Sequence, residues 1–126
     1  MSVRSELAVA LVGALPPTWR MIDTGENIEP PPATIPAVLQ LMRTDVAPGL
    51  TQALRAHEYT LQLMEPHLTG VSGEDALDEN LDTVLDALET LPAVEFLRAE
   101  RGTWPRDVYP SYAIALRVQA NKKETT

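Results

Sequence analysis

One apolar stripe in the second half of the chain constrains the fold more than any other feature. Its members recur mostly at intervals of three and four, as on one face of an α-helix: Leu77, Leu81, Val84, Leu85, Leu88 and Leu91. The surface around this stripe is acidic: Glu74, Asp75, Asp78, Glu79, Asp82, Asp86 and Glu89. The pattern predicts an amphipathic helix with Leu81 and Leu85 in the core. Ser72 with Asp75 resembles a capping box at its start, and Pro92 marks its end.

The same segment has the oxygen spacing of a calcium-binding loop. Positions one, three, five, nine and twelve of an EF-hand are matched by Asp78, Asn80, Asp82, Asp86 and Glu89. However, Thr83 stands where the loop needs glycine, and Pro92 interrupts a helix leaving the loop. Two glycines within residues 69–77 leave little room for an entering helix. We therefore expect a solvated helix over residues 78–89 and no calcium binding.

Periodicity elsewhere predicts one more helix and five strands. The helix is expected over residues 3–15, ending at two prolines. The strands are expected at residues 18–23, 35–43, 57–64, 93–101 and 111–119, with long loops at residues 23–34 and 44–53. Short, hairpin-like connections favour a mainly antiparallel sheet with both helices on its apolar face. This is an α+β fold in the order α-β-β-β-α-β-β. It forms a single domain over residues 1–126, with a frayed tail over residues 120–126.

Side-chain alternation in two strands predicts which face of the sheet is buried. Tyr59, Leu61 and Leu63 share one side of the first, and Tyr112, Ile114, Leu116 and Val118 share one side of the second. These sides are expected to pack against the helices. The reverse face is small or polar, which suits water or a partner better than a second core layer.

Composition and charge exclude several classes of function. The chain carries 18 acidic and 10 basic residues, a formal net charge of −8, which argues against a surface for nucleic acid or anionic membrane. It has no cysteine, and therefore no disulfide, thiol nucleophile or thiolate metal site. Glu6 interrupts the apolar start of the chain, which favours an amphipathic helix over a signal peptide.

No group of residues indicates catalysis. His57 and His67 stand ten apart, and the sequence has no zinc-protease helix, phosphate-binding glycine loop or serine elbow. We therefore expect no catalytic, metal-binding or cofactor-binding residue, and a protein that is not an enzyme.

Several segments together resemble the tail terminator proteins of long-tailed (siphovirus-like) bacteriophages. They are "LPPTWRMID", "IPAVLQLMR", "ALDENLDTVLDAL", "FLRAERGTW" and "YPSYAIALRV". The resemblance implies a structural protein that forms a ring, typically of six copies, on the head-proximal end of the tail tube. There it stops tube growth and offers a surface to the head connector. It implies a place in the virion neck, assembly in the host bacterial cytoplasm, DNA passage without specific binding, and no cofactor or membrane.

Contacts with neighbouring subunits or tail proteins are expected at the two long loops and near the final turn. Ile28 and Leu50 are isolated apolar residues in the loops, and Arg98, Arg101 and Arg106 are expected to pair with acids of adjacent subunits. Trp104 and Tyr109 complete the expected interface, although tryptophans beside prolines also suit the ends of a core. The alternatives are another neck, tail-completion or connector protein, an acidic cellular protein-binding module, and an unrecognised small enzyme.

Overall fold

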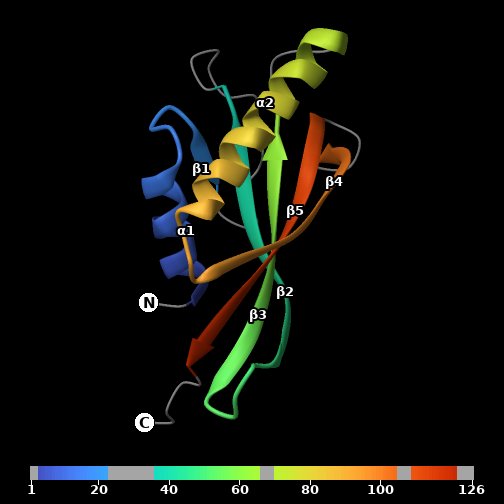
Figure 1. Ribbon diagram of the computed structural model, residues 1–126. Coiled ribbons are helices and arrows are strands. Elements are labelled where there is room, and N and C mark those ends of the chain that lie inside the picture. Colours follow the sequence, from blue (N-terminus) through green and yellow to red (C-terminus); the bar gives the residue numbers. More distant parts are fainter. Residues whose placement is uncertain (1–2, 23–35, 66–69, 105–108, 122–126) are drawn as a thin grey trace.

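The computed structural model describes residues 3–22, 36–65, 70–104 and 109–121. Its elements are α1 (Val3–Ala14), β1 (Arg20–Ile22), β2 (Val38–Pro48), β3 (Leu54–Met64), α2 (Gly70–Glu89), β4 (Val94–Trp104) and β5 (Tyr109–Asn121) (Figure 1). The order of helices and strands agrees with the order expected from periodicity, and the α+β fold class is confirmed.

The strands form one sheet in the order β1-β2-β3-β5-β4. The three pairings among β2, β3, β5 and β4 are antiparallel, whereas β1 pairs with β2 in parallel over three residues. The sheet is therefore mixed, but mainly antiparallel as expected. Because β1 and β4 are the outer strands, each has one side unpaired by any described strand.

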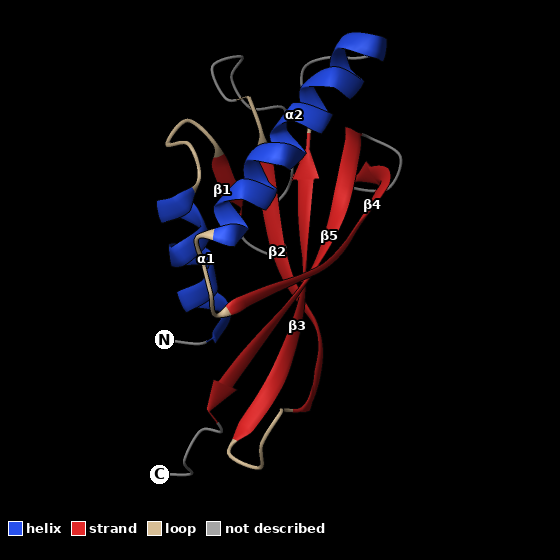
Figure 2. Ribbon diagram, viewed as in Figure 1, coloured by secondary structure: helices blue, strands red, loops and turns tan. Residues whose placement is uncertain are grey.

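Both helices lie on one face of the sheet (Figure 2) and bury its apolar side. From α1, Leu7, Leu11 and Leu15 enter the core, and from α2, Leu77, Val84 and Leu88 do so. The predicted apolar sides of the strands are confirmed, because the same cluster contains Tyr59, Leu61, Leu63, Ile114, Leu116 and Val118. Leu81 and Leu85, expected in the core, are only half-buried at its margin. The apolar stripe therefore covers a wider part of the helix surface than the part of α2 that is buried against the sheet.

Helix α2 begins at Gly70, earlier than the sequence indicated. Ser72 therefore lies inside the helix, and the capping-box interpretation is wrong. The expectation that glycines exclude a helix here is also wrong. Gly73 is buried on the packed face, where a contact with the core outweighs glycine's low helix propensity. Residues 78–89 are continuous helix, as predicted, so their carboxylates cannot converge as in a calcium loop.

The hairpin of β2 and β3 is much longer than expected. Strand β2 continues to Pro48 and β3 begins at Leu54, so the first half of the expected loop over residues 44–53 is strand and only residues 49–53 form the turn. The turn is closed by hydrogen bonds from Gly49 N to Leu54 O (3.0 Å) and from Leu54 N to Thr51 O (3.1 Å). Pro48 is tolerated because it ends its strand.

The final hairpin is also longer than expected. Residues 102–104 and 109–110, expected in a turn, belong to β4 and β5. A bulge between Phe96 and Arg98 shifts the register within β4, so its side chains do not alternate regularly between the two faces. Strand β5 reaches Asn121, so the predicted frayed tail from residue 120 overlaps its end.

The reverse face of the sheet is less uniformly polar than expected. Arg117 bonds Glu58 at 3.0 Å and Glu95 at 3.4 Å, which makes a charged row across three strands. Further along the same face, however, Val38 and Met64 form a second buried cluster with Ile22. Part of this face is therefore apolar core, which the short alternating patterns did not reveal.

Candidate functional site

The long β2–β3 hairpin projects beyond both helices, together with the end of β5 (Figure 1). Its register pairs Arg43 with Tyr59, Val46 with His57, and Pro48 with Arg55. The side chains of these pairs point to the face that carries the helices, because opposite residues of an antiparallel pair share a face. A bulge between Arg43 and Asp45 turns Val46 to this side.

Three arginines are spaced along this projecting face. Arg43 and Arg55 are exposed on the hairpin, and Arg4 stands in the first turn of α1 beside it. We call the surface formed by Arg4, Arg43, Val46, Arg55 and Tyr59 the arginine surface. Arg98, Arg101 and Arg117 form ion pairs with described acids, whereas no ion pair within the described part of the chain involves an arginine of this surface.

Tyr59 occupies the inner end of the arginine surface. Its side chain is 1% exposed, and its hydroxyl has no hydrogen-bond partner among the described residues. Burial raises the pKa of this hydroxyl, and the charges of Arg43 and Arg4 oppose the rise. The His57 ring stacks beside it, with ring centroids 6.4 Å apart. A buried donor without an acceptor is unfavourable, so this is a place where an arriving acceptor improves the local free energy.

The outer surface of α2 has the opposite charge. Asp75, Glu79, Asp82 and Asp86 are exposed at the spacing i, i+4, i+7 and i+11, which places them on one line opposite the buried leucines. We call this line the acidic stripe. The described residues offer none of its carboxylates an ion-pair partner. The last turn of α2 carries no basic residue, so Asp86, at that end of the stripe, lies near the negative end of the helix dipole without compensation.

Two acids on the flank of α2 have a different role. Arg101 of β4 donates to Glu74 (Nε to Oε2, 2.9 Å), and the Tyr112 hydroxyl of β5 donates to Asp78 at 2.8 Å. The hydrogen bond from Arg101 lowers the pKa of Glu74, and the hydrogen bond to Asp78 raises the pKa of Tyr112. These contacts fasten α2 to the sheet and leave the acidic stripe facing outward.

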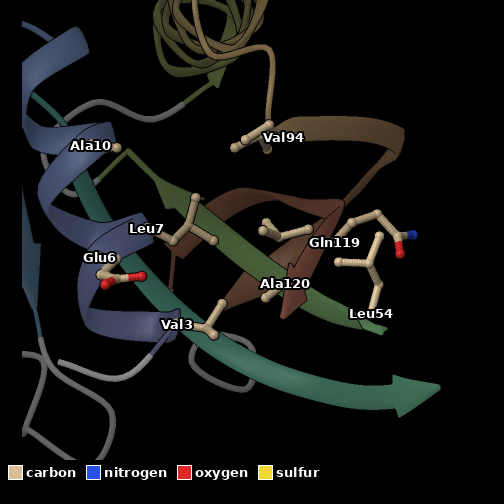
Figure 3. A pocket seen from close by; sticks show the side chains of 10 residues that line it. Val3, Glu6, Leu7, Ala10, Leu54, Val94, Gln119 and Ala120 are labelled. Atoms are coloured by element: carbon tan, nitrogen blue, oxygen red, sulfur yellow. The ribbon is translucent and has the colours of Figure 1, made fainter. Parts of the chain in front are cut away.

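A groove of about 520 Å³ lies between α1 and the sheet (Figure 3). Figure 3 shows Val3 and Leu7 reaching from α1 toward the strands, with Glu6 beside them and Leu54, Gln119 and Ala120 across the groove. The lining is mostly apolar and holds one carboxylate, so it offers a contact surface more than a reaction centre. Among the described residues, no three His, Asp or Glu side chains are grouped to hold a metal ion.

The interface residues expected from the sequence do not converge on one site. Leu50 is 84% exposed at the hairpin tip, where its N–H donates to Gln119 Oε1 at 3.2 Å. Arg98 pairs with the neighbouring Glu100 at 3.0 Å, and Arg101 is engaged with Glu74. Tyr109 is half-buried against the second cluster. Ile28, Arg106 and His67, and the side chain of Trp104, lie outside the described residues.

The sequence analysis did not find the arginine surface. Arg4, Arg43 and Arg55 are far apart in the chain, and Arg43 ends an expected strand whereas Arg55 falls between an expected loop and the next expected strand. These residues share a surface only because β2 and β3 form a long hairpin that turns at Gly49. Its register places Arg43 opposite Tyr59 and Arg55 opposite Pro48, and this register exists only if β2 extends to Pro48.

In comparisons with known proteins, no family model matches the sequence and no curated protein matches it significantly. Neither α1 nor α2 has the length and apolar character required to cross a membrane.

Proposed function

We propose that this protein is a structural virion protein, a tail terminator that forms a ring on the head-proximal end of a phage tail tube and presents the surface for the head connector. The observation that carries the proposal is the pair of unlike outer strands. One end of the sheet is the three-residue β1, and the other is the eleven-residue β4. Unlike surfaces on one chain favour head-to-tail contacts between copies, which close into a ring when the rotation allows it.

The resemblance in the sequence and the character of the surface support the same function. The exposed features include an acidic stripe, an arginine surface and Leu50 at the tip of a fixed turn. Such features suit protein contacts. Tail tube protein, the head connector or stopper, and other copies of the chain are the partners in this proposal.

The proposal is tested by the mass of the purified protein, measured by light scattering with and without tail tubes, and by microscopy of particles lacking the gene. We expect a ring of one defined copy number on tube ends. Phage without the gene should make tails of uncontrolled length that do not join to heads. Tubes of normal length that join heads in its absence contradict the proposal.

A second candidate is an acidic module that binds a basic cellular protein, and the uncompensated acids in the last turn of α2 favour it. A stable monomer that ignores tail tubes and forms a one-to-one complex with a basic protein is the result expected for this candidate.

A further inference from the structure

We propose that the arginine surface of one copy binds the acidic stripe on α2 of a second copy. This inference rests on the proposed function, since it supplies a specific contact between neighbours in the ring. The bound group is a row of carboxylates on α2, and the receiving group is a set of guanidinium groups on the hairpin and at the start of α1.

Charge complementarity is the first argument. The chain has a net charge of −8, yet Arg4, Arg43 and Arg55 lie along one surface without an ion-pair partner among the described residues. The acidic stripe likewise lacks a basic partner there. Guanidinium groups bind carboxylates through paired, charge-assisted hydrogen bonds, which are stronger than hydrogen bonds between neutral groups.

The two surfaces also have matching lengths. From Asp75 to Asp86 the stripe extends about 16 Å along α2, at about 1.5 Å per residue. From Arg55 to Tyr59, which lies opposite Arg43, the hairpin extends about 13 Å. A helix laid along the hairpin therefore brings successive carboxylates to Arg43 and Arg55. Val46, which is 40% exposed between them, supplies an apolar contact.

One chain cannot make this contact with itself. The acidic stripe faces away from the sheet, and the hairpin projects from the end of the sheet away from the start of α2 (Figure 1). Two different surfaces are therefore used by each copy, as in a head-to-tail ring.

The contact removes two unfavourable features. A carboxylate held between Arg4 and Arg43 brings an acceptor toward the buried Tyr59 hydroxyl, which lacks one in the described chain. Arginines near Asp86 also place positive charge at the negative end of the α2 dipole, where no basic residue of α2 stands.

Charge reversal and charge exchange test the contact, with mass measured by sedimentation at low salt. The arginine variant (R43E with R55E) has a net charge of −12, from −8 − 4, and the stripe variant (D82R with D86R) has −4, from −8 + 4. Each alone should lose assembly at concentrations where the wild type assembles. The chain with all four changes returns to −8 and should assemble again.

If net charge alone governed assembly, the −4 variant would assemble better than the wild type, and that result would overturn the inference. Circular dichroism and thermal unfolding identify any variant that fails to fold.

Cross-linking tests the contact directly, because the chain has no cysteine of its own. Chains with V46C are mixed with chains with D82C and oxidised. We expect disulfide-linked V46C–D82C dimers, and little product from V46C with the control R98C, since Arg98 lies on the reverse face opposite Ala115. Mainly V46C–V46C dimers, or no V46C–D82C product, overturn the inference.

The two tests separate this contact from the proposed function. Rings on tail tubes without V46C–D82C cross-links leave the function and remove the contact. Specific cross-links in assemblies that never cap a tube leave the contact and remove the function.

Discussion

At the scale of single residues, burial separates side chains that look alike in the sequence. Leu77 is fully buried against the sheet, whereas Leu81 is only half-buried, although both belong to one periodic stripe. Tyr59 and Tyr112 alternate in phase with the same core, yet one hydroxyl lacks a partner among the described residues and the other bonds Asp78. Periodicity identifies the face of an element, but the depth of each side chain depends on the neighbouring element.

Truncation of α2 leucines should follow this difference in depth. Leu77→Ala should reduce the free energy of unfolding by about 2–5 kcal/mol, because it leaves a cavity in the core. Leu81→Ala should cost less, and Asp82→Asn should change stability by less than about 0.5 kcal/mol as an exposed position. Urea denaturation of the three variants measures these values. Equal losses for Leu77→Ala and Asp82→Asn contradict the orientation of the helix.

Removal of the two tyrosine hydroxyls should have opposite effects on the monomer. Tyr59→Phe should leave its stability unchanged or slightly raised, since the hydroxyl is buried without a partner among the described residues. Tyr112→Phe should cost about 0.5–1.5 kcal/mol through loss of the 2.8 Å hydrogen bond to Asp78. Thermal unfolding at dilute, monomeric concentration compares them. A larger loss for Tyr59→Phe shows that its hydroxyl is already bonded.

At the scale of elements, the sequence predicted existence and order well and boundaries poorly. Apolar periodicity is local, so it located both helices and all five strands of the described fold. The loop expected from residue 44 and the glycines expected to exclude a helix both give way to regular elements, because pairing extends β2 to Pro48 and packing allows α2 to begin at Gly70. The arginine surface was missed for the same reason. It depends on register between distant residues, which no single segment encodes.

The turn at Gly49 should be sensitive to substitution in a way that a helical glycine is not. A Cβ on Gly49 would lie 2.7 Å from the Leu54 carbonyl carbon, so Gly49→Ala should cost about 1–3 kcal/mol. A Cβ on Gly13 meets nothing within 4 Å, so Gly13→Ala should stabilise α1 by about 0.5–1 kcal/mol. Urea denaturation of this matched pair checks both signs. A neutral Gly49→Ala means that the turn relaxes at no cost.

The hydrogen-bonded ion pair between Arg101 and Glu74 should make the attachment of α2 to the sheet dependent on pH. Hydrogen bonding lowers the folded-state pKa of Glu74, so the stabilisation is complete above the unfolded value of about 4.3 and is lost as pH falls through the folded value. Arg101→Gln should therefore be less stable than the wild type at pH 7, and the difference should shrink on acidification. Unfolding curves of both proteins from pH 7 to pH 3 measure it. A difference that does not depend on pH means that Arg101 acts through packing alone.

At the scale of the whole molecule, charge is distributed by surface more than by segment. The sheet and the flank of α2 pair their charges internally, through Arg117 with Glu58 and Arg101 with Glu74. Two groups of charges without an ion pair among the described residues lie apart from each other, on the arginine surface at the hairpin and on the acidic stripe of α2. The proposed assembly through these two surfaces covers Arg4, Arg43 and Arg55 and leaves an acidic particle, which suits the proposed passage of DNA through a ring.

The wild-type assembly should therefore not retain DNA. At physiological salt its negative field extends about 8 Å, and arginines engaged by a neighbour's carboxylates cannot neutralise phosphates.

Neutralising the stripe with D75N, E79Q, D82N and D86N changes the net charge from −8 to −4 and frees the arginine surface. This variant should bind duplex DNA more tightly than the wild type, with an affinity that falls steeply with salt. Fluorescence anisotropy with labelled duplex, measured beside sedimentation, compares the two proteins. Tight, salt-dependent DNA binding by the assembled wild type contradicts free passage, because it requires arginines that the assembly is expected to cover.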